Sequence, residues 1–200
     1  QENKGLTKSL NIGINNSSGK YIARQDADDI SYPERIKNQV NTFENDSTLV
    51  LLGTRANINY KGFIYESPSY TDTEIKYKLK RINVFVHSSV MFRRCDFMKI
   101  GMYNELYKCS QDYEAWIRLS EFGKLSILKN VLVERTIREN SISYKKLLFQ
   151  CYSGYKIRRS HTPLELNIII SLYQLISYFC PTWIIRIVKK HNLLQFRMQL

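Results

Sequence analysis

Short apolar runs alternate with helix-like segments along the first 140 residues, and this order constrains the fold more than any other feature. The runs of strand length lie at residues 21–24, 49–52, 55–58, 63–65, 84–93 and 125–133. Helices are predicted at residues 8–14, 33–43, 73–81 and 111–122. Strands that alternate with helices predict an α/β fold with a mixed sheet flanked by helices. An "NYKG" turn at residues 59–62 predicts a hairpin between two of the runs.

The helix predicted at residues 33–43 has a marked beginning. Ser31 and Glu34 have the spacing of a capping box, and Pro33 suits the first turn of a helix. The apolar residues that recur at helical spacing, and so predict its buried face, are Ile36, Val40 and Phe43.

Composition narrows the class of protein. A chain of 200 residues with 44% hydrophobic content can bury a full core. The four cysteines form no CxxC pair and the three histidines form no ligand cluster, so we expect a reduced, cytoplasmic setting without structural zinc. The polar first eight residues do not resemble a signal segment, and secretion is not expected.

The net charge of +12 is unevenly distributed. Residues 1–140 carry 21 basic and 17 acidic side chains, whereas residues 141–200 carry nine basic and one acidic. This asymmetry indicates a polyanionic partner, which is either nucleic acid or an anionic membrane surface. The basic residues do not interleave with a known nucleic-acid reader motif, so no nucleic acid partner is predicted.

An acidic cluster follows the first predicted strand in "YIARQDADD", residues 21–29. Carboxylates about 4 Å apart repel by about 4 kcal/mol at an effective dielectric near 20, so this cluster needs a positive charge or solvent. If the backbone stays extended, Asp26 and Asp28 share a face and Asp29 points elsewhere. Mg²⁺ or Mn²⁺ would then supply the charge and keep coordination positions for a diphosphate. Arg24 is a second source of positive charge, and it could pair either with Asp26 or with a phosphate.

Other interpretations of the acidic cluster remain open. Aspartates before a helix often cap its N–H groups, and a lone "DADD" more often has that structural role. An EF-hand fits poorly because Ile30 and Ser31 occupy a ligand position and the glycine position. A phosphatase with an aspartate nucleophile fits only loosely.

Several motifs occur in an order that carries a family resemblance. They are "GLTKSLNIGINNSSGKYIARQDADDISYPERIKNQ" (5–39), "HSSVMFRR" (87–94), "IGMYNELYKCSQDYEAWIRLSEFGK" (100–124) and "RENSIS" (138–143). Together they resemble the nucleotide-diphospho-sugar part of family 2 glycosyltransferases. The resemblance implies a GT-A fold and inverting, metal-dependent transfer of a sugar from a nucleotide-diphospho-sugar donor. It further implies a saccharide or lipid-linked acceptor in cell-surface polysaccharide or glycolipid assembly.

The resemblance also assigns roles to residues. Asp28 and Asp26 match the family's D-x-D motif and are expected to hold Mn²⁺ or Mg²⁺. Both are expected to bind the donor, together with Arg24 and His87. The alternative for His87 is a packed core residue or a surface residue on a strand.

In the motif "SQDYEAWIRLSEFG", Asp112 matches the family's catalytic base and lies in the first turn of the predicted helix. A first-turn aspartate can instead simply stabilise the helix dipole. Trp116 aligns with an aromatic residue near the acceptor and is equally well placed for the core. The side chains expected on the inner face of this helix are Tyr113, Trp116, Ile117 and Ser120.

Two departures from the family pattern qualify these expectations. Many relatives have "YRxHxxS" where this chain has "RTIRENS", so Arg138 stands at the histidine position and Thr136 at the arginine position. Arg138 could contact a phosphate but cannot ligate a metal. Nothing before Gly5 matches the family's first strands, so we expect an N-terminally incomplete domain. A catalytically inactive remnant that binds nucleotide or a partner, and a basic peripheral-membrane adaptor, are the alternative functions.

Two parts are predicted: a glycosyltransferase domain at 1–143 and a basic, hydrophobic helical tail at 144–200. Residues 166–185 are uncharged and could extend about 30 Å as a helix. Polar residues recur on one stripe of this segment, at Asn167, Ser171, Gln174 and Ser177. This pattern favours a helix in the interface of an anionic membrane, at the cytoplasmic face, over a spanning helix. A helix packed on the domain is the alternative.

Overall fold

The computed structural model describes residues 2–60, 62–137 and 147–179. Its strands are β1 (Tyr21–Ala23), β2 (Ile30–Ser31), β3 (Leu49–Tyr60), β4 (Phe63–Glu66), β5 (Met91–Arg93) and β6 (Lys124–Ile137). Its helices are α1 (Leu6–Asn16), α2 (Arg35–Asn45), α3 (Asp72–Leu79), α4 (Arg94–Lys99), α5 (Gln111–Leu119), α7 (Leu147–Arg158) and α8 (Leu164–Phe179), with a 3-10 turn η1 (His87–Ser89). The predicted alternation of strands and helices is confirmed.

The strands of the described residues form one mixed sheet. Its order is β1-β5-β3-β6-β2, with β4 paired to β3. The neighbours β3 and β6 run parallel, whereas β1–β5, β3–β5, β3–β4 and β2–β6 are antiparallel. The predicted hairpin is present as β3–β4, with Tyr60 opposite Phe63. The runs predicted at 49–52 and 55–58 are one continuous strand, β3, at the centre of the sheet.

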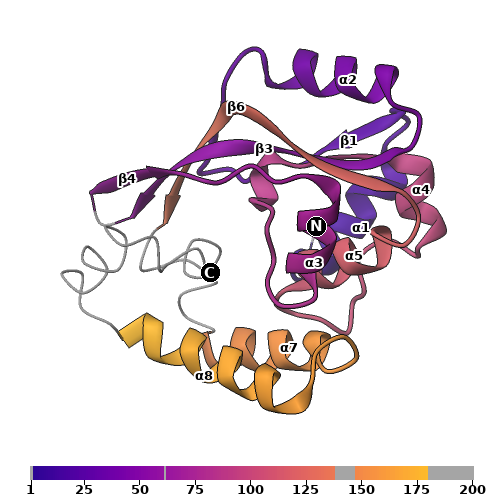
Figure 1. Ribbon diagram of the computed structural model, residues 1–200. Helices are drawn as coiled ribbons and strands as arrows, with labels where there is room; N and C mark the ends of the chain where they lie inside the picture. Colours follow the sequence, from indigo (N-terminus) through magenta and orange to yellow (C-terminus); the bar gives the residue numbers. More distant parts are fainter. Residues whose placement is uncertain (1, 61, 138–146, 180–200) are drawn as a thin grey trace.

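Helices cover both faces of the sheet, as Figure 1 shows, with α2 on one side and α1, α3, α4 and α5 on the other. Under α2, Phe43 packs with Leu49, Leu52 and Met91. The larger core lies on the opposite face, where Leu51 packs with side chains from α3 and α5. Adjacent residues of β3 therefore serve different cores, because side chains alternate along a strand.

The capping box predicted from Ser31 and Glu34 at the beginning of α2 is absent. The Ser31 hydroxyl donates to Gln25 Oε1 (2.5 Å), and Glu34 at the N-cap makes no capping hydrogen bond. The buried face is also rotated, because Ile36 is 47% exposed whereas Arg35 and Gln39 are buried. Val40 and Phe43 still pack as predicted, and Arg35 and Gln39 take the place of Ile36 on the buried face.

A capping box exists instead at α3. The Thr71 hydroxyl accepts from Glu74 N, and Glu74 Oε2 accepts from Thr71 N at 2.9 Å. This reciprocal pair satisfies two backbone donors at the beginning of the helix.

The strand predicted at 84–93 is confirmed only at β5. Before it, Ser89 N donates to the Val86 carbonyl at 2.8 Å, and the chain forms the turn η1. Asn83 Oδ1 also accepts from Phe85 N at 3.1 Å. The sequence predicted His87 on a strand, but it lies on a turn.

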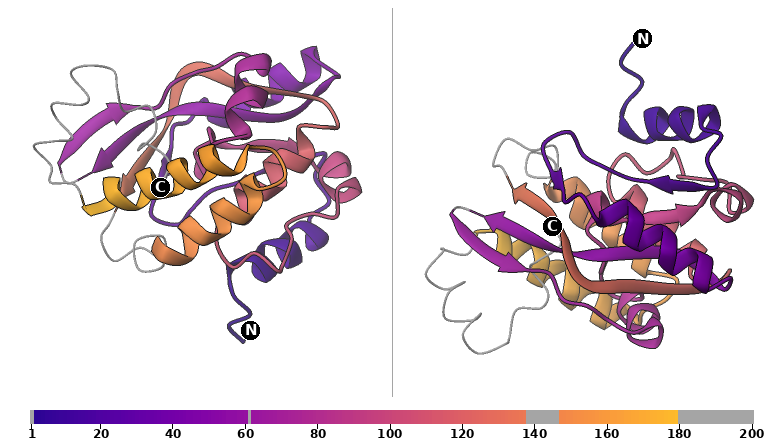
Figure 2. Two further views of the ribbon diagram at one scale, coloured as in Figure 1. Left: turned by 60° about the horizontal axis from the view of Figure 1, so that its bottom comes forward. Right: turned by 90° about the horizontal axis from the view of Figure 1, so that it is seen from above.

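The helices α7 and α8 form an antiparallel pair that lies beyond α3 and α5, on the side away from the sheet (Figure 2). Within the described residues, no helix combines the length and the apolar character needed to cross a bilayer. The basic end of the predicted tail, residues 180–200, lies outside the described residues.

Candidate functional site

The acidic turn lies at the end of β1, where the backbone does not stay extended. Residues 27–29 form a turn, and Asp29 N donates to the Asp26 carbonyl at 3.3 Å. Asp26 is half-buried and Asp28 is exposed. The extended backbone on which the predicted shared face of Asp26 and Asp28 depended is thus absent.

Asp26 is neutralised within the protein. Its Oδ1 accepts from the Arg24 guanidinium, and its Oδ2 accepts from the Ser88 hydroxyl at 2.9 Å. Burial acts to raise the pKa of Asp26, but Arg24, His87 and Ser88 together hold this pKa below its ordinary value. The positive charge that the acidic cluster requires is therefore supplied in part by Arg24.

An extended backbone would turn Asp29 away from the cluster, but its carboxyl interacts with the cluster. It is half-buried, and burial raises the pKa of its carboxyl above the ordinary value. The nearby Ser88 hydroxyl and the charge of Arg135 act in the opposite direction. Asp29 is therefore within electrostatic reach of Asp26, Asp28 and Arg135.

The buried Arg35 of α2 fixes the backbone that carries the cluster. Its Nη2 donates to the carbonyls of Arg24 (2.7 Å) and Val90 (3.1 Å), and its Nη1 donates to Gln25 Oε1 at 2.8 Å. Arg24 N donates to the same Val90 carbonyl at 2.9 Å. The guanidinium thus joins α2, the end of β1 and the residue before β5.

His87 lies between the two acidic regions. Burial lowers the pKa of this imidazole; the charges of Asp112 and Asp26 oppose the shift, and those of Arg24 and Arg135 add to it. Its Nε2 lies 3.0 Å from the Tyr103 hydroxyl. The ring is therefore neutral at pH 7 and within electrostatic reach of carboxylates from both β1 and α5.

Asp112 lies in the first turn of α5, as predicted. The preceding Ser110 has a left-handed φ of 57°, which turns the chain into the helix. Asn83 Nδ2 donates to Asp112 Oδ2 at 2.8 Å and so orients the carboxylate. Among the described residues, no hydrogen bond to the other oxygen, Asp112 Oδ1, is present.

Trp116 occupies a core position and not an acceptor surface. Its side chain is fully buried, and its ring lies 6.1 Å from that of His87 and 6.0 Å from that of Phe97. An acceptor could contact it only after the core opened, so its predicted role in acceptor binding has no support here. Tyr113 is buried as predicted, whereas Ile117 and Ser120 are only partly buried.

Sequence reasoning missed four side chains of this region: Asn83, Ser88, Tyr103 and Arg135. Ser88 and Asp26 are 62 residues apart, and Asn83 and Asp112 are 29 apart. No local spacing could reveal such contacts. Ser88 directly follows His87 in the motif "HSSVMFRR", and this position was the only sequence indication of its role. Arg138, by contrast, lies outside the described residues, and Thr136 belongs to β6.

The residues present suit a divalent ion only as a partial site. Asp28 is exposed, and Asp26 provides a second carboxylate in the same turn, and such oxygens are the ligands that Mg²⁺ and Mn²⁺ prefer. Both Asp26 oxygens already accept hydrogen bonds. In the described part of the chain, no group of three or more His, Cys, Asp or Glu side chains could hold a metal. An ion here would need ligands from a bound diphosphate.

Comparisons with known proteins show which family the chain resembles in sequence. The model of the glycosyl transferase family 2 matches residues 1–101. An uncharacterized glycosyltransferase of Methanocaldococcus jannaschii is 33% identical over 165 residues, covering 79% of this chain and 56% of that protein. The amylovoran biosynthesis glycosyltransferase AmsE of Erwinia amylovora is 32% identical over 128 residues, covering 62% of this chain and 47% of that protein. The chain thus spans about half the length of these curated relatives.

A solved structure shows the same fold. Residues 1–349 of S. aureus TarS, in complex with UDP-GlcNAc, match with a TM-score of 0.60 at 15% identity, over 86% of this chain and 52% of that one. The fold is therefore the GT-A fold, as predicted. With the family model matching half of its residues, the chain belongs to glycosyl transferase family 2.

Proposed function

We propose that the protein transfers a sugar from a nucleotide-diphospho-sugar to a saccharide or lipid-linked acceptor, with inversion at the anomeric carbon. Family membership and the amylovoran relative support a role in polysaccharide or glycolipid assembly, which we place at the cytoplasmic face of the membrane. One observation carries the proposal. The turn η1 lies between two acidic elements: Ser88 Oγ donates to Asp26 after β1 at 2.9 Å. The neighbouring His87 ring lies 6.1 Å from that of Trp116 in α5, the helix that carries Asp112.

The donor end of the site is the acidic turn. Asp28 and Asp26 would hold Mn²⁺ or Mg²⁺ together with the donor diphosphate, and this ion supplies positive charge to the leaving group. Arg24 neutralises Asp26 and so limits the negative charge that an incoming diphosphate meets. His87, being neutral at pH 7, offers the donor a hydrogen-bonding group without adding a charge.

The acceptor end is Asp112. Its carboxylate takes the proton from the acceptor hydroxyl as that oxygen bonds to the anomeric carbon, opposite the departing nucleoside diphosphate. Asn83 holds one carboxylate oxygen and leaves the other to receive the proton. A base held in this way loses little orientational freedom when the acceptor arrives.

Measurements of nucleotide binding and of turnover distinguish the metal-binding role of Asp28 from the base role of Asp112. We expect Asp28→Asn to abolish Mn²⁺-dependent binding of UDP or GDP in calorimetry, because a neutral amide is a poor ligand for a hard cation. The Asp112→Asn variant should bind the same nucleotide with the affinity of the wild type. Glu121→Gln, which alters an exposed carboxylate beyond the end of α5, is the matched control.

With a cognate donor and acceptor, Asp112→Asn should lower kcat by about 10² to 10⁴-fold with little change in the donor KM. Equal, metal-independent nucleotide binding by the wild type and Asp28→Asn would exclude the metal site. Unchanged turnover in Asp112→Asn would exclude that base. Nucleotide binding without any transfer would instead support the inactive remnant.

A further inference from the structure

The α7–α8 hairpin has its polar side chains turned toward the protein. Arg158 is buried, and it donates from Nε to Asn167 Oδ1 (2.9 Å) and from Nη2 to Ser171 Oγ (2.6 Å). Asn167 Nδ2 donates to the Tyr155 carbonyl at 3.0 Å, which ties α8 back to α7. Gln174, further along the same stripe, is also buried. The polar stripe found in the sequence therefore lines the interior of the hairpin.

Contacts with the catalytic domain fix which side of the hairpin faces outward. Ile157 of α7 belongs to the main core, and Arg158 interacts electrostatically with the Tyr113 side chain of α5. The Thr162 hydroxyl donates to the Lys80 carbonyl at 2.5 Å. Because the polar stripe and these contacts share the inner side, the large apolar side chains on the opposite side of each helix are left outside.

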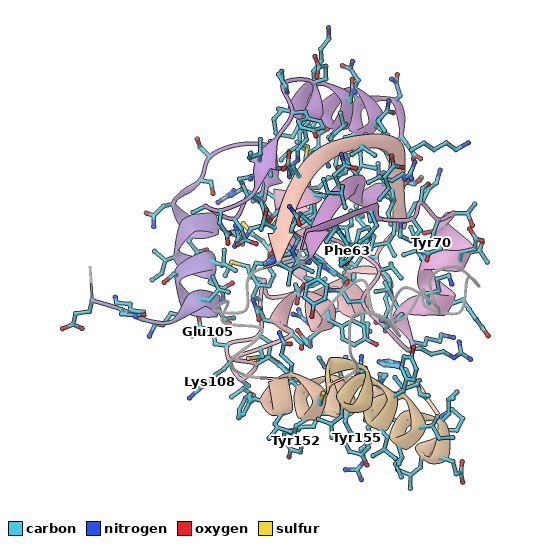
Figure 3. All side chains as sticks on the ribbon, turned by 90° about the vertical axis from the view of Figure 1, so that its left-hand side faces the viewer. Phe63, Tyr70, Glu105, Lys108, Tyr152 and Tyr155 are labelled. Carbon is cyan, nitrogen blue, oxygen red and sulfur yellow. The ribbon has the colours of Figure 1, made fainter. Side chains whose placement is uncertain are left out.

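The outer side of the hairpin is accordingly apolar. Figure 3 shows Tyr152 on the side of the hairpin that faces away from the sheet. Six large side chains, each between 43% and 70% exposed, define what we call the apolar face: Leu148, Phe149, Tyr152, Ile168, Ile169 and Leu172. They recur at helical spacing on each helix, so each set forms a single stripe. A soluble surface seldom gathers so many exposed apolar side chains without a partner.

Charge identifies the partner. Lys156 and Arg159 are exposed beside the apolar face, and Lys156 Nζ lies 5.8 Å from the centre of the Tyr152 ring. Residues 141–200 contain nine basic residues and one acidic residue. A symmetric contact between two copies would bring these like charges together. We propose that the apolar face lies in the interface of an anionic membrane, with the polar stripe packed against the protein instead of exposed to water.

This proposal does not depend on catalysis and can be tested on the whole protein without substrates. Flotation with phosphatidylcholine vesicles, with and without phosphatidylglycerol, should show binding only to the anionic vesicles, with less binding at high salt. Ile169→Ser with Leu172→Ser should weaken binding at least about tenfold, because both side chains would lose their apolar contact with lipid. Lys156→Glu with Arg159→Glu should weaken it as well.

Matched controls are Leu106→Ser and Ile64→Ser, which change side chains that are 88% and 69% exposed but lie outside the hairpin. These controls should bind vesicles like the wild type. The thermal unfolding midpoint of each variant should stay close to the wild-type value, because exposed substitutions usually alter stability by about 0.5 kcal/mol or less.

Three results would overturn the proposal. Binding that resists both high salt and alkaline carbonate would show integral insertion. A dimer in solution that dissociates in the Ile169→Ser, Leu172→Ser variant, without vesicle binding, would assign the apolar face to a second copy. A monomer that binds neither vesicle type would show that another part of the chain covers the face.

Discussion

Replacing Arg35 with methionine would remove five hydrogen bonds from a buried guanidinium while largely keeping the length of the side chain. Besides the three bonds to Arg24, Val90 and Gln25, Arg35 donates to Ser31 Oγ at 2.7 Å and to Gln39 Oε1 at 3.2 Å. No carboxylate of the described residues lies within 4 Å of it. Burial and the neighbouring Arg24 lower its pKa to about 10, so it stays charged at neutral pH.

The expected cost follows from opposing effects. Hydrogen bonds from a charged donor contribute about 1.5–3 kcal/mol each, and a buried acceptor left unpaired costs about 1–3 kcal/mol. Removing an uncompensated buried cation offsets part of this loss. We therefore expect Arg35→Met to lower the free energy of unfolding by about 2–4 kcal/mol. For a chain of this size, that corresponds to a fall in Tm of about 6–12 °C.

Arg35→Lys separates charge from geometry. Lysine keeps the positive charge, but a single ammonium cannot reach acceptors on several elements at once, so we expect most of the loss to remain. Arg159→Met, at an exposed arginine, should change stability by about 0.5 kcal/mol or less. Urea unfolding at pH 7, followed by far-UV circular dichroism, gives all three values. A midpoint for Arg35→Met equal to that of Arg159→Met would refute the role of Arg35 as a structural clamp.

Two further predictions concern stability. Gly123→Ala should destabilise the protein by about 1–3 kcal/mol, because the new Cβ would lie 2.6 Å from the Thr48 carbonyl oxygen; Gly13→Ala, with open space around it, should be neutral or stabilising in urea unfolding. Hydrogen bonds from Lys124 and Thr48 lower the pKa of Asp46 from 3.8 to about 2, so its contribution is present above pH 3.8 and is lost as the pH falls toward 2. The stability difference between Asp46→Asn and the wild type should therefore shrink between pH 4 and pH 2, and a constant difference would contradict the assignment.

Local pattern was a good guide to the elements and a poor guide to their details. The helix at α5, the hairpin at β3–β4 and the position of Asp112 all followed from spacing and turn residues. The cap of α2 did not, because Ser31 is engaged by Gln25 and Arg35. Capping rules describe a helix in isolation, and here a competing hydrogen-bond network took the capping residue.

The candidate site shows a similar division. The ordered motifs identified the family and singled out Asp26, Asp28 and Asp112 as candidates, since these depend on residue type and order alone. Those motifs could not show that Arg24 neutralises Asp26 or that Trp116 is buried. Both facts depend on which distant side chains fill the space around these residues.

The tail separates the two kinds of information most clearly. The sequence alone determined that a polar stripe at Asn167, Ser171 and Gln174 opposes an apolar one, because helical periodicity is a local property. Only the tertiary structure decided which stripe faces inward. Arg158 is buried in the hairpin and needs hydrogen-bond acceptors, and Asn167 and Ser171 supply them. The polar stripe therefore turns inward and the apolar stripe outward, because leaving a buried guanidinium without acceptors costs more free energy than exposing apolar side chains.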